Sequence, residues 1–269
     1  MDDKIKEFFD FVRTIKGPQA RSNAVLTPAS LEAAMNERGA QIVIGQDAAV
    51  VLEPDTDNIL RLQYYARSSE ALSGIPDLVP PTQRRVVCDI VGREPKAGEQ
   101  ADELARAGFS FYAKFQRMFC KELCPDDTLD ITDVEEARPE DAEEILEITY
   151  EAFDPLTARI MTREALIKRI EEGEVFLVRR DGCIAGFTSF DSNEKRVALL
   201  DHVIVRPEYR EQKIAKKILT YKWKHKNCSD HYILWINALC TGPIRYHEKN
   251  GFEKDGMYDY ILIMQKKEQ

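Results

Sequence analysis

The stretch Leu200–Leu219, LDHVIVRPEYREQKIAKKIL, decides the fold of the second half of the chain. Asp201–Val205 is short, apolar and β-branched, which predicts a buried strand. Pro207 ends that strand because proline has no N–H to donate to a neighbouring strand. Apolar residues then recur at helical spacing from Ile214. Because a helix N-terminus presents free backbone N–H groups and a favourable dipole, the stretch predicts a phosphate-binding turn.

This turn resembles motif A of the GNAT-type acetyltransferase superfamily, which reads V-x-P-x-x-[RQ]-x-x-G-x-[GA] and binds the pyrophosphate of acetyl-CoA. Val205, Pro207, Arg210 and Ala215 match the pattern. Lys213 stands where the family usually has its first glycine, which lets the backbone approach phosphate closely. The Lys213 ammonium could contact the phosphate, or the side chain could block the cradle if this position requires a positive φ.

A second resemblance lies downstream, after a predicted strand at Tyr232–Asn237. The family's motif B reads A-I-x-x-Y-E-K-x-G-F after its fifth strand, and this chain has PIRYHEKNGF. His247 falls on the tyrosine position, with Tyr246 immediately before it, and Cys240 sits where an asparagine is common. Gly251 is expected to end the helix in a left-handed conformation. Two motifs in order are far more specific than either alone.

Composition limits the classes of function. The 269 residues allow two small domains, and a hydrophobic content of 43% is enough for a substantial core. The formal net charge of −9 argues against a nucleic-acid partner, which favours a basic surface. No signal peptide or membrane-spanning run is visible, so we expect a cytoplasmic protein with no membrane partner. The six cysteines show no metal-ligand spacing, so we expect free thiols and no metal.

The domain organisation is predicted from a polar, acidic linker at Cys124–Asp130. It separates a domain at residues 1–124 from one at residues 131–269. In the second domain, strands are expected at 134–138, 175–179, 183–190, 197–205, 232–237 and 258–264. Helices are expected at 139–153, from 162 to near 173, up to 226 and up to 250. This order, β-α-α-β-β-β-α-β-α-β, is that of the GNAT family.

The first half shows a weaker echo of the same order. Strands are expected at 42–44, 48–53, 59–66, 85–91 and 112–119, with helices from 69 and at 99–107. The helix end LARAGF, residues 104–109, resembles HEKNGF, but no basic turn accompanies it. The fold class is therefore α/β (α+β), with a GNAT-like mixed central sheet flanked by helices. We expect two tandem GNAT-like domains, the first degenerate; the alternative is an unrelated α/β domain.

The resemblance also implies site residues. The backbone of Val203 and Val205 would pair with the pantetheine arm, and the N–H of Val203 would stabilise the oxyanion. Asp201 fills a position where the family often has a base, although it could simply form an ion pair. Period two predicts that Asp201 shares a face with Val203 and Val205, with His202 opposite. The implied cofactor-binding residues are Val203, Ile204, Val205, Arg210, Glu211, Gln212, Lys213, Ile214, Ala215, Lys216 and Cys240.

His247 is the candidate general acid, since an imidazolium could protonate the leaving thiolate near neutral pH. Tyr246 competes for this role, and the alternative is that no acid is needed. Together these features imply a cytoplasmic N-acetyltransferase that moves an acetyl group directly from acetyl-CoA to a primary amine of a small molecule or peptide. The reaction would proceed in a ternary complex, in a monomer or homodimer. A non-catalytic acyl-CoA-binding or protein-interaction module is the alternative, as is a longer acyl chain or an alcohol acceptor.

Overall fold

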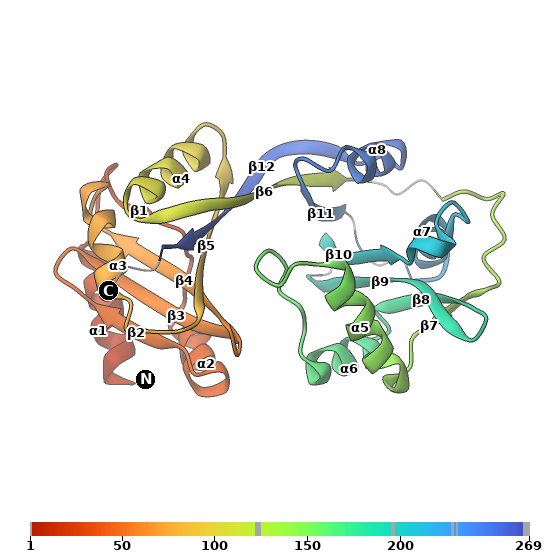
Figure 1. The fold of residues 1–269 in the computed structure, drawn as a ribbon, viewed down its shortest axis with the longest axis horizontal. Helices are drawn as coiled ribbons and strands as arrows, with labels where there is room; N and C mark the ends of the chain where they lie inside the picture. Colours follow the sequence, from red (N-terminus) through yellow and green to blue (C-terminus); the bar gives the residue numbers. More distant parts are fainter. Residues whose placement is uncertain (1, 122–124, 195–196, 227–228, 230, 266–269) are drawn as a thin grey trace. The chain divides into compact units, whose positions relative to one another are not determined.

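The computed structural model describes residues 2–121, 125–194, 197–226, 229 and 231–265. The chain divides into two compact units (Figure 1). Unit 1 consists of Met1–Phe115 and Gly256–Gln269, and unit 2 of Gln116–Asp255. The expected domain ranges, 1–124 and 131–269, differ from these units in two ways: the boundary falls after Phe115, and residues from Gly256 onward group with unit 1. Of the expected linker, Cys124 lies outside the described residues.

Unit 2 is built on a mixed sheet in the order β6-β11-β10-β9-β8-β7. The β7–β8, β8–β9 and β9–β10 pairs are antiparallel, whereas β10 and β11 are parallel. This arrangement confirms the mixed sheet expected for the second half of the chain. The strands are β6 (Phe109–Cys120), β7 (Val134–Glu136), β8 (Val175–Arg180), β9 (Cys183–Glu194), β10 (Val197–Val205) and β11 (His231–Asn237).

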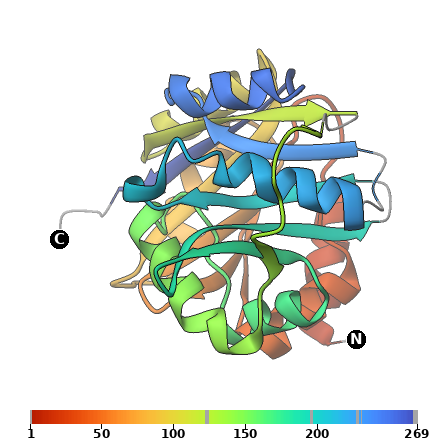
Figure 2. The same cartoon turned by 90° about the vertical axis from the view of Figure 1, so that its right-hand side faces the viewer.

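Helices cover both faces of this sheet, as Figure 2 shows. One hydrophobic cluster joins α5 and α6 to Val175 and Leu177, and another joins α7 and α8 to Phe176 and Val178. Alternate residues of β8 therefore face opposite layers, as strand geometry requires. The helices are α5 (Ala142–Ala152), α6 (Arg163–Glu171), α7 (Ile214–Lys226) and α8 (Thr241–Lys249), with 3₁₀ turns η2 (Pro139–Asp141) and η3 (Pro207–Tyr209).

The predicted helix ends in unit 2 agree with the structure. Thr162 precedes α6 and its hydroxyl accepts a hydrogen bond from the N–H of Ala165 at 3.2 Å. Gly251 follows α8 with φ of +88°, the left-handed conformation that glycine adopts at little cost.

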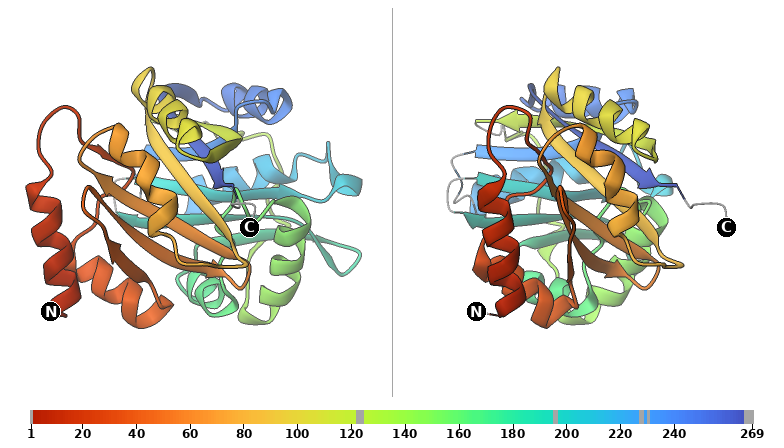
Figure 3. Two further views of the ribbon diagram at one scale, coloured as in Figure 1. Left: turned by 60° about the vertical axis from the view of Figure 1, so that its left-hand side comes forward. Right: turned by 90° about the vertical axis from the view of Figure 1, so that its left-hand side faces the viewer.

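Unit 1 repeats this plan. Its sheet runs β2-β3-β4-β5-β12-β6, with α1 and α2 in the cluster on one face and α3 and α4 in the cluster on the other (Figure 3). The sequence analysis did not predict α1, α2 or β1. The elements are α1 (Asp3–Thr14), β1 (Arg21–Ser22), α2 (Pro28–Arg38), β2 (Gln41–Ile44), β3 (Ala48–Thr56), β4 (Ile59–Ala66), η1 (Glu70–Gly74), α3 (Ile75–Leu78), β5 (Arg85–Arg93), α4 (Lys96–Arg106) and β12 (Glu253–Met264).

The repeat is clearest in the strand pairing. In unit 1, β2-β3-β4-β5 are paired antiparallel, antiparallel and parallel, and β8-β9-β10-β11 follow the same sequence in unit 2. The helix α4 precedes Gly108 and Phe109 as α8 precedes Gly251 and Phe252. These correspondences confirm the expected tandem arrangement.

Two strands pass from one unit to the other. β12 pairs with β5 from Met257 to Ile263, and Leu262 belongs to the core of unit 1. β6 begins at Phe109 in the core of unit 1 and reaches the core of unit 2 at Met118. The last strand of the chain therefore groups with the first unit, which the sequence did not reveal.

Candidate active site

The parallel strands β10 and β11 pair over only a short length. The register joins Val197–Leu199 to His231–Ile233, and beyond it the two strands no longer pair. β10 nevertheless continues to Val205 and β11 to Asn237. The facing edges beyond Leu199 thus hold backbone N–H and C=O groups without a partner in the opposite strand. Such a gap suits an extended ligand with amide groups of its own.

A β-bulge lies at the start of this gap. Leu200 is opposite Phe190 and His202 is opposite Ser189, so Asp201 is an extra residue in β10. An extra residue exchanges the faces of all that follow it.

The side chains confirm this exchange. Val203 and Val205 pack with the α7 cluster, whereas Ile204 belongs to the α5/α6 cluster. The ring of His202 contacts Phe153 on the α5/α6 side, with centroids 4.9 Å apart. Val203 and Val205 therefore share a face, with His202 on the other side, as predicted. Only Asp201, the extra residue of the bulge, departs from the alternation.

Asp201 lies beside His202 rather than opposite it. Its carboxylate Oδ2 is 3.4 Å from His202 Nδ1, and the Ser189 hydroxyl lies 3.4 Å from the same nitrogen. Asp201 is half-buried, while His202 and Ser189 are buried. A carboxylate at the mouth of a gap, with an imidazole behind it, can accept a proton from a bound amine.

The turn after β10 has the backbone shape that the family glycine would give. Glu211 and Lys213 both have positive φ, +69° and +58°. The Lys213 carbonyl accepts a hydrogen bond from the N–H of Lys217 at 2.9 Å, so α7 begins directly after Lys213. The first-turn N–H groups, from Ile214 to Lys216, have no partner within an α-helix. Lys213 thus keeps a glycine-like backbone, and its exposed side chain does not fill the turn.

This conformation leads to a stability prediction for Lys213. We expect Lys213→Gly to be more stable than Lys213→Ala by about 1 kcal/mol, because a Cβ is unfavourable at this φ. Urea unfolding of the two variants measures the difference. Lys216, inside α7, supplies the control with the opposite sign, since alanine should exceed glycine there by about 1 kcal/mol. Equal stability of Lys213→Gly and Lys213→Ala would contradict the left-handed assignment.

The lysines of α7 are largely committed to ion pairs. Lys216 Nζ lies 2.7 Å from Asp126, and Lys217 Nζ lies 2.8 Å from Asp133. The Lys216 ammonium, followed by hydrogen bonds from Thr128, lowers the pKa of Asp126 well below its usual range. These lysines therefore attach the acidic segment to α7, and the ammonium of Lys216, one of the predicted binding residues, is engaged with Asp126.

The cations closest in sequence to the turn are arranged differently. Arg210 and Lys213 are exposed, and no ion pair involves either of them in the part of the chain that the structure describes. Their charges remain available for an anion at the turn.

Helix α8 positions Tyr246 and His247 differently from expectation. His247 is buried against Tyr246 and Phe252, with ring centroids 5.1 and 5.4 Å away. Burial lowers the pKa of His247 to about 4, so its ring is neutral near pH 7. The expected imidazolium acid is therefore contradicted by the environment of this residue.

Tyr246 keeps its proton. Burial raises the pKa of its hydroxyl to about 12. Among the described residues, no hydrogen-bond partner reaches this buried hydroxyl. A buried hydroxyl with an unused donor can donate to an anion that develops nearby.

Two further positions shape the site. Cys240 carries an exposed thiol at the start of α8, three residues after β11 ends. Gly186 of β9 packs so closely that an added Cβ would lie 2.7 Å from the Ile204 carbonyl oxygen and 3.0 Å from Ile214. The sequence analysis missed Gly186, whose signal is a glycine inside a strand.

The described residues contain no group of histidine, cysteine, aspartate and glutamate side chains that could hold a metal ion. Within the same residues, no helix combines the length and the apolar character needed to cross a membrane.

Comparison with solved structures identifies the fold. A GCN5-related N-acetyltransferase from Kribbella flavida superposes with a TM-score of 0.57 and 15% identity, covering 88% of this chain and 93% of the other. A tandem GNAT protein from the clavulanic acid biosynthesis pathway gives 0.57 and 14%, covering 97% and 94%. A GNAT-family acetyltransferase from Colwellia psychrerythraea gives 0.56 and 16%, covering 98% and 97%.

Sequence comparison adds a local match. No curated protein gives a significant match to the chain. Residues 171–254, which include β10, the turn, β11 and α8, match the acetyltransferase (GNAT) domain family. The chain therefore carries a GNAT acetyltransferase domain at these residues, within a two-unit fold that is similar to that of a solved tandem GNAT protein.

Proposed function

We propose that the protein is an acetyl-CoA-dependent N-acetyltransferase whose active site lies in unit 2. The observation that carries this proposal is the gap between β10 and β11, which leads along β10 into the left-handed turn at Lys213. One ligand with an amide-bearing arm and a diphosphate satisfies both parts. The arm would pair with β10 between Asp201 and Val205, and the diphosphate would lie on the N–H groups from Ile214.

Binding would involve the predicted residues in two ways. Glu211, Gln212, Lys213, Ile214, Ala215 and Lys216 would offer backbone N–H groups, and Arg210 and Lys213 would add exposed charge. Val203, Ile204 and Val205 would border the arm, and Cys240 would lie across the gap at the end of β11.

The chemical step would be a direct transfer. The amine nitrogen attacks the thioester carbonyl carbon, the C–S bond breaks, and CoA leaves as a thiolate. Asp201 accepts the proton from the amine, directly or through water. A backbone N–H of β10, at Val203, stabilises the developing oxyanion.

Tyr246 would assist the leaving group by hydrogen bonding. Its pKa of about 12 exceeds that of a free thiol, about 8.5, so full proton transfer would cost about 5 kcal/mol. A hydrogen bond to the thiolate avoids that cost and still lowers the barrier. His247, being neutral, would position Tyr246 through their ring contact.

The rival proposal is a non-catalytic acyl-CoA-binding module. The first experiment is calorimetry with acetyl-CoA and with desulfo-CoA. If neither ligand binds the protein, both the enzyme and the binding-module proposals are wrong. CoA release over a panel of primary amines, with alcohols and longer acyl-CoAs as comparison substrates, then separates an enzyme from a binder. Binding without CoA release from any of these substrates would favour the module.

Tyr246→Phe gives the sharpest test of the mechanism. We expect kcat to fall by about tenfold to a hundredfold, while the affinity for acetyl-CoA changes less than about twofold. The cause is the loss of one donor to the leaving thiolate. Stopped-flow or steady-state CoA release measures kcat, and calorimetry measures affinity. His247→Phe is the matched variant: if it lowered kcat more than Tyr246→Phe, the assignment of the donor would be wrong.

A further inference from the structure

Unit 1 has a gap of its own between parallel strands. β4 pairs with β5 only from Ile59–Arg61 to Arg85–Val87, and both strands continue beyond this point. β3 occupies one edge of β4 along its whole length. The other edge is therefore open after Arg61, as the edge of β10 is open in unit 2.

This gap is filled by the chain itself. β1 pairs antiparallel with β4, with Arg21 opposite Ala66 and Ser22 opposite Tyr65. Because β3 already occupies one edge of β4, β1 must lie on the edge that faces β5. The segment between α1 and α2 thus enters unit 1 at the place where an acyl-CoA arm would enter unit 2.

Asn23 connects the two diverging strands. Its Nδ2 donates to the Leu62 carbonyl of β4 at 3.0 Å and to the Asp89 carbonyl of β5 at 3.1 Å. The same nitrogen lies 3.3 Å from Cys88 Sγ, and Asn23 Oδ1 accepts the N–H of Tyr64 at 2.7 Å. One side-chain amide therefore satisfies backbone groups on both strands at the narrow end of the gap.

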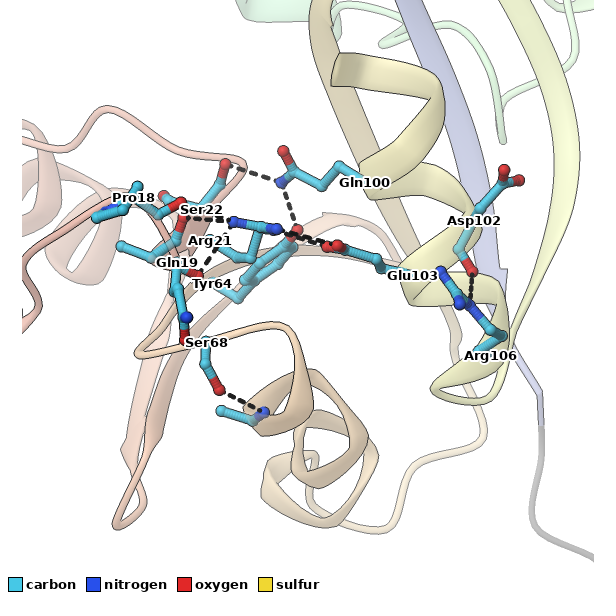
Figure 4. Close-up of polar contacts among 12 residues, drawn as sticks. Pro18, Gln19, Arg21, Ser22, Tyr64, Ser68, Gln100, Asp102, Glu103 and Arg106 are labelled. Atoms are coloured by element: carbon cyan, nitrogen blue, oxygen red, sulfur yellow. Dashed lines mark hydrogen bonds and ion pairs between the residues drawn. The ribbon is translucent and has the colours of Figure 1, made fainter. Parts of the chain in front are cut away.

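Arg21 and Ser22 are held by side chains of α4, and Figure 4 shows these contacts beside Tyr64 of β4. Arg21 forms a bidentate salt bridge with Glu103: its Nε lies 2.7 Å from Oε2 and its Nη2 lies 3.0 Å from Oε1. Gln100 donates to the Ser22 carbonyl at 3.0 Å and lies 2.6 Å from the Tyr64 hydroxyl.

On the far side, the Tyr65 hydroxyl donates to the Ala24 carbonyl at 3.0 Å and accepts the Leu26 N–H at 3.1 Å. Each residue from 21 to 24, as well as Leu26, therefore has a hydrogen bond to β4, β5 or α4 of the same unit.

Unit 2 provides the contrast. The corresponding segment between α5 and α6, residues 153–162, contains no strand among the described residues, and none of them pairs with β10. The N–H groups of Thr157 and Ala158 donate within the segment, to the Asp154 carbonyl at 2.9 and 3.0 Å. Among the described residues, no strand from this segment lies beside β10, whereas β1 lies beside β4 in unit 1.

The turn after β4 also differs from the one after β10. It leads into η1, a 3₁₀ turn of 5 residues, rather than into a long helix. Arg67 is held by the Thr14 hydroxyl at 2.8 Å and by the Gln46 carbonyl, and Glu70 begins η1 with a negative charge. After β4 there is thus a 3₁₀ turn with an acidic start and a hydrogen-bonded arginine, in place of the α-helix N-terminus and exposed cations that follow β10.

We propose that the gap between β4 and β5 is a cleft for an extended peptide, filled by residues 21–26 of the same chain in place of a pantetheine arm. Unit 1 consequently takes no acyl-CoA, and each chain binds one. This second part rests on the proposed function, whereas the filling of the cleft does not.

Cys88 provides a direct readout of the filled cleft. It is fully buried, and Asn23 covers its sulfur. We expect Asn23→Ala to raise the rate of Cys88 alkylation by a small thiol reagent at least tenfold, measured by peptide mass spectrometry. Val25→Ala, at a 98% exposed position of the same segment, should leave the rate unchanged. Arg21→Ala removes the ion pair with Glu103 but not the contact of Asn23 with Cys88, so it should raise the alkylation rate less.

Unfolding of the whole of unit 1 would also expose Cys88. Amide hydrogen exchange of β3 is therefore measured in the same samples, because it reports that unfolding. The proposal requires β3 to stay protected while Cys88 reacts. An unchanged Cys88 rate in Asn23→Ala and in Arg21→Ala/Asn23→Ala would overturn it, as would a rise accompanied by exchange throughout β3.

Hydrogen exchange of the unmodified protein with acetyl-CoA tests the second part. We expect slower exchange at residues 200–216 and no change at residues 62–70, with one acetyl-CoA bound per chain. Protection of residues 62–70, or two bound per chain, would overturn the second part. Absence of any binding would refute the proposed function and leave the Cys88 result to decide on the filled cleft.

Discussion

Glu174→Gln is expected to lower the free energy of unfolding of unit 2 by about 3–5 kcal/mol. The reason is Lys222, which is only 1% exposed and whose Nζ lies 2.7 Å from the Glu174 carboxylate. Its ammonium also lies over the rings of Phe176 and Phe190, 5.5 and 5.0 Å from their centroids. Removal of the carboxylate charge leaves a buried cation without compensation. Denaturant unfolding followed in unit 2 measures the loss.

A double variant separates this cause from a loss of packing. Lys222→Met/Glu174→Gln should regain most of the stability, because no buried charge remains. The exposed pair Lys224–Asp127 supplies the control, and Asp127→Asn should cost less than about 0.5 kcal/mol. If Glu174→Gln cost no more than Asp127→Asn, the buried pair would not have the importance that its burial indicates.

The second large effect concerns acidic pH. The pKa of His247 is about 4 in the folded protein, below the ordinary 6.5. Between these values the unfolded chain binds a proton that the folded chain does not. Stability therefore falls as the pH falls from about 6.5 to about 4, by about 3 kcal/mol in total. Above pH 6.5 this residue has no effect on the pH dependence.

Other groups also titrate in this range, so the measurement is a comparison. Unfolding free energies of the wild type and His247→Phe are determined between pH 4 and 8. The difference between the two proteins should shift by about 3 kcal/mol across the window, whereas His225→Gln, at an exposed position of α7, should run parallel to the wild type. If the unfolding free energies of His247→Phe and the wild type changed with pH in parallel, burial would not lower the pKa of the His247 imidazole.

The sequence predicted the strands and helices of unit 2 well, because motif spacing and periodicity are local. It missed α1, although Ile5, Phe8, Phe9 and Val12 recur at helical spacing. It also missed the bulge at Asp201, since neither glycine nor proline marks the extra residue. Period two therefore placed Asp201 opposite His202, whereas its carboxylate lies 3.4 Å from His202 Nδ1, because alternation holds only while the register does.

Other features could not be read locally at all. His247 has an ordinary helical context, and only the fold shows that it is buried against Phe252. The residues that fill the gap of unit 1, RSNA, carry no motif, because their meaning comes from β4 and β5. The sequence did not decide whether Lys213 adopts the left-handed conformation, since a lysine can adopt this φ only at a cost in free energy.

The path of β12 has a consequence for how the protein is made. Unit 1 contains the first 115 residues, yet its sheet also needs Met257–Ile263 to pair with β5. During synthesis unit 1 must therefore wait until residues 257–263 have been made, while unit 2 can form earlier from a continuous segment. A nonsense mutation shortly before Met257 would accordingly damage unit 1, although most of that unit is translated first.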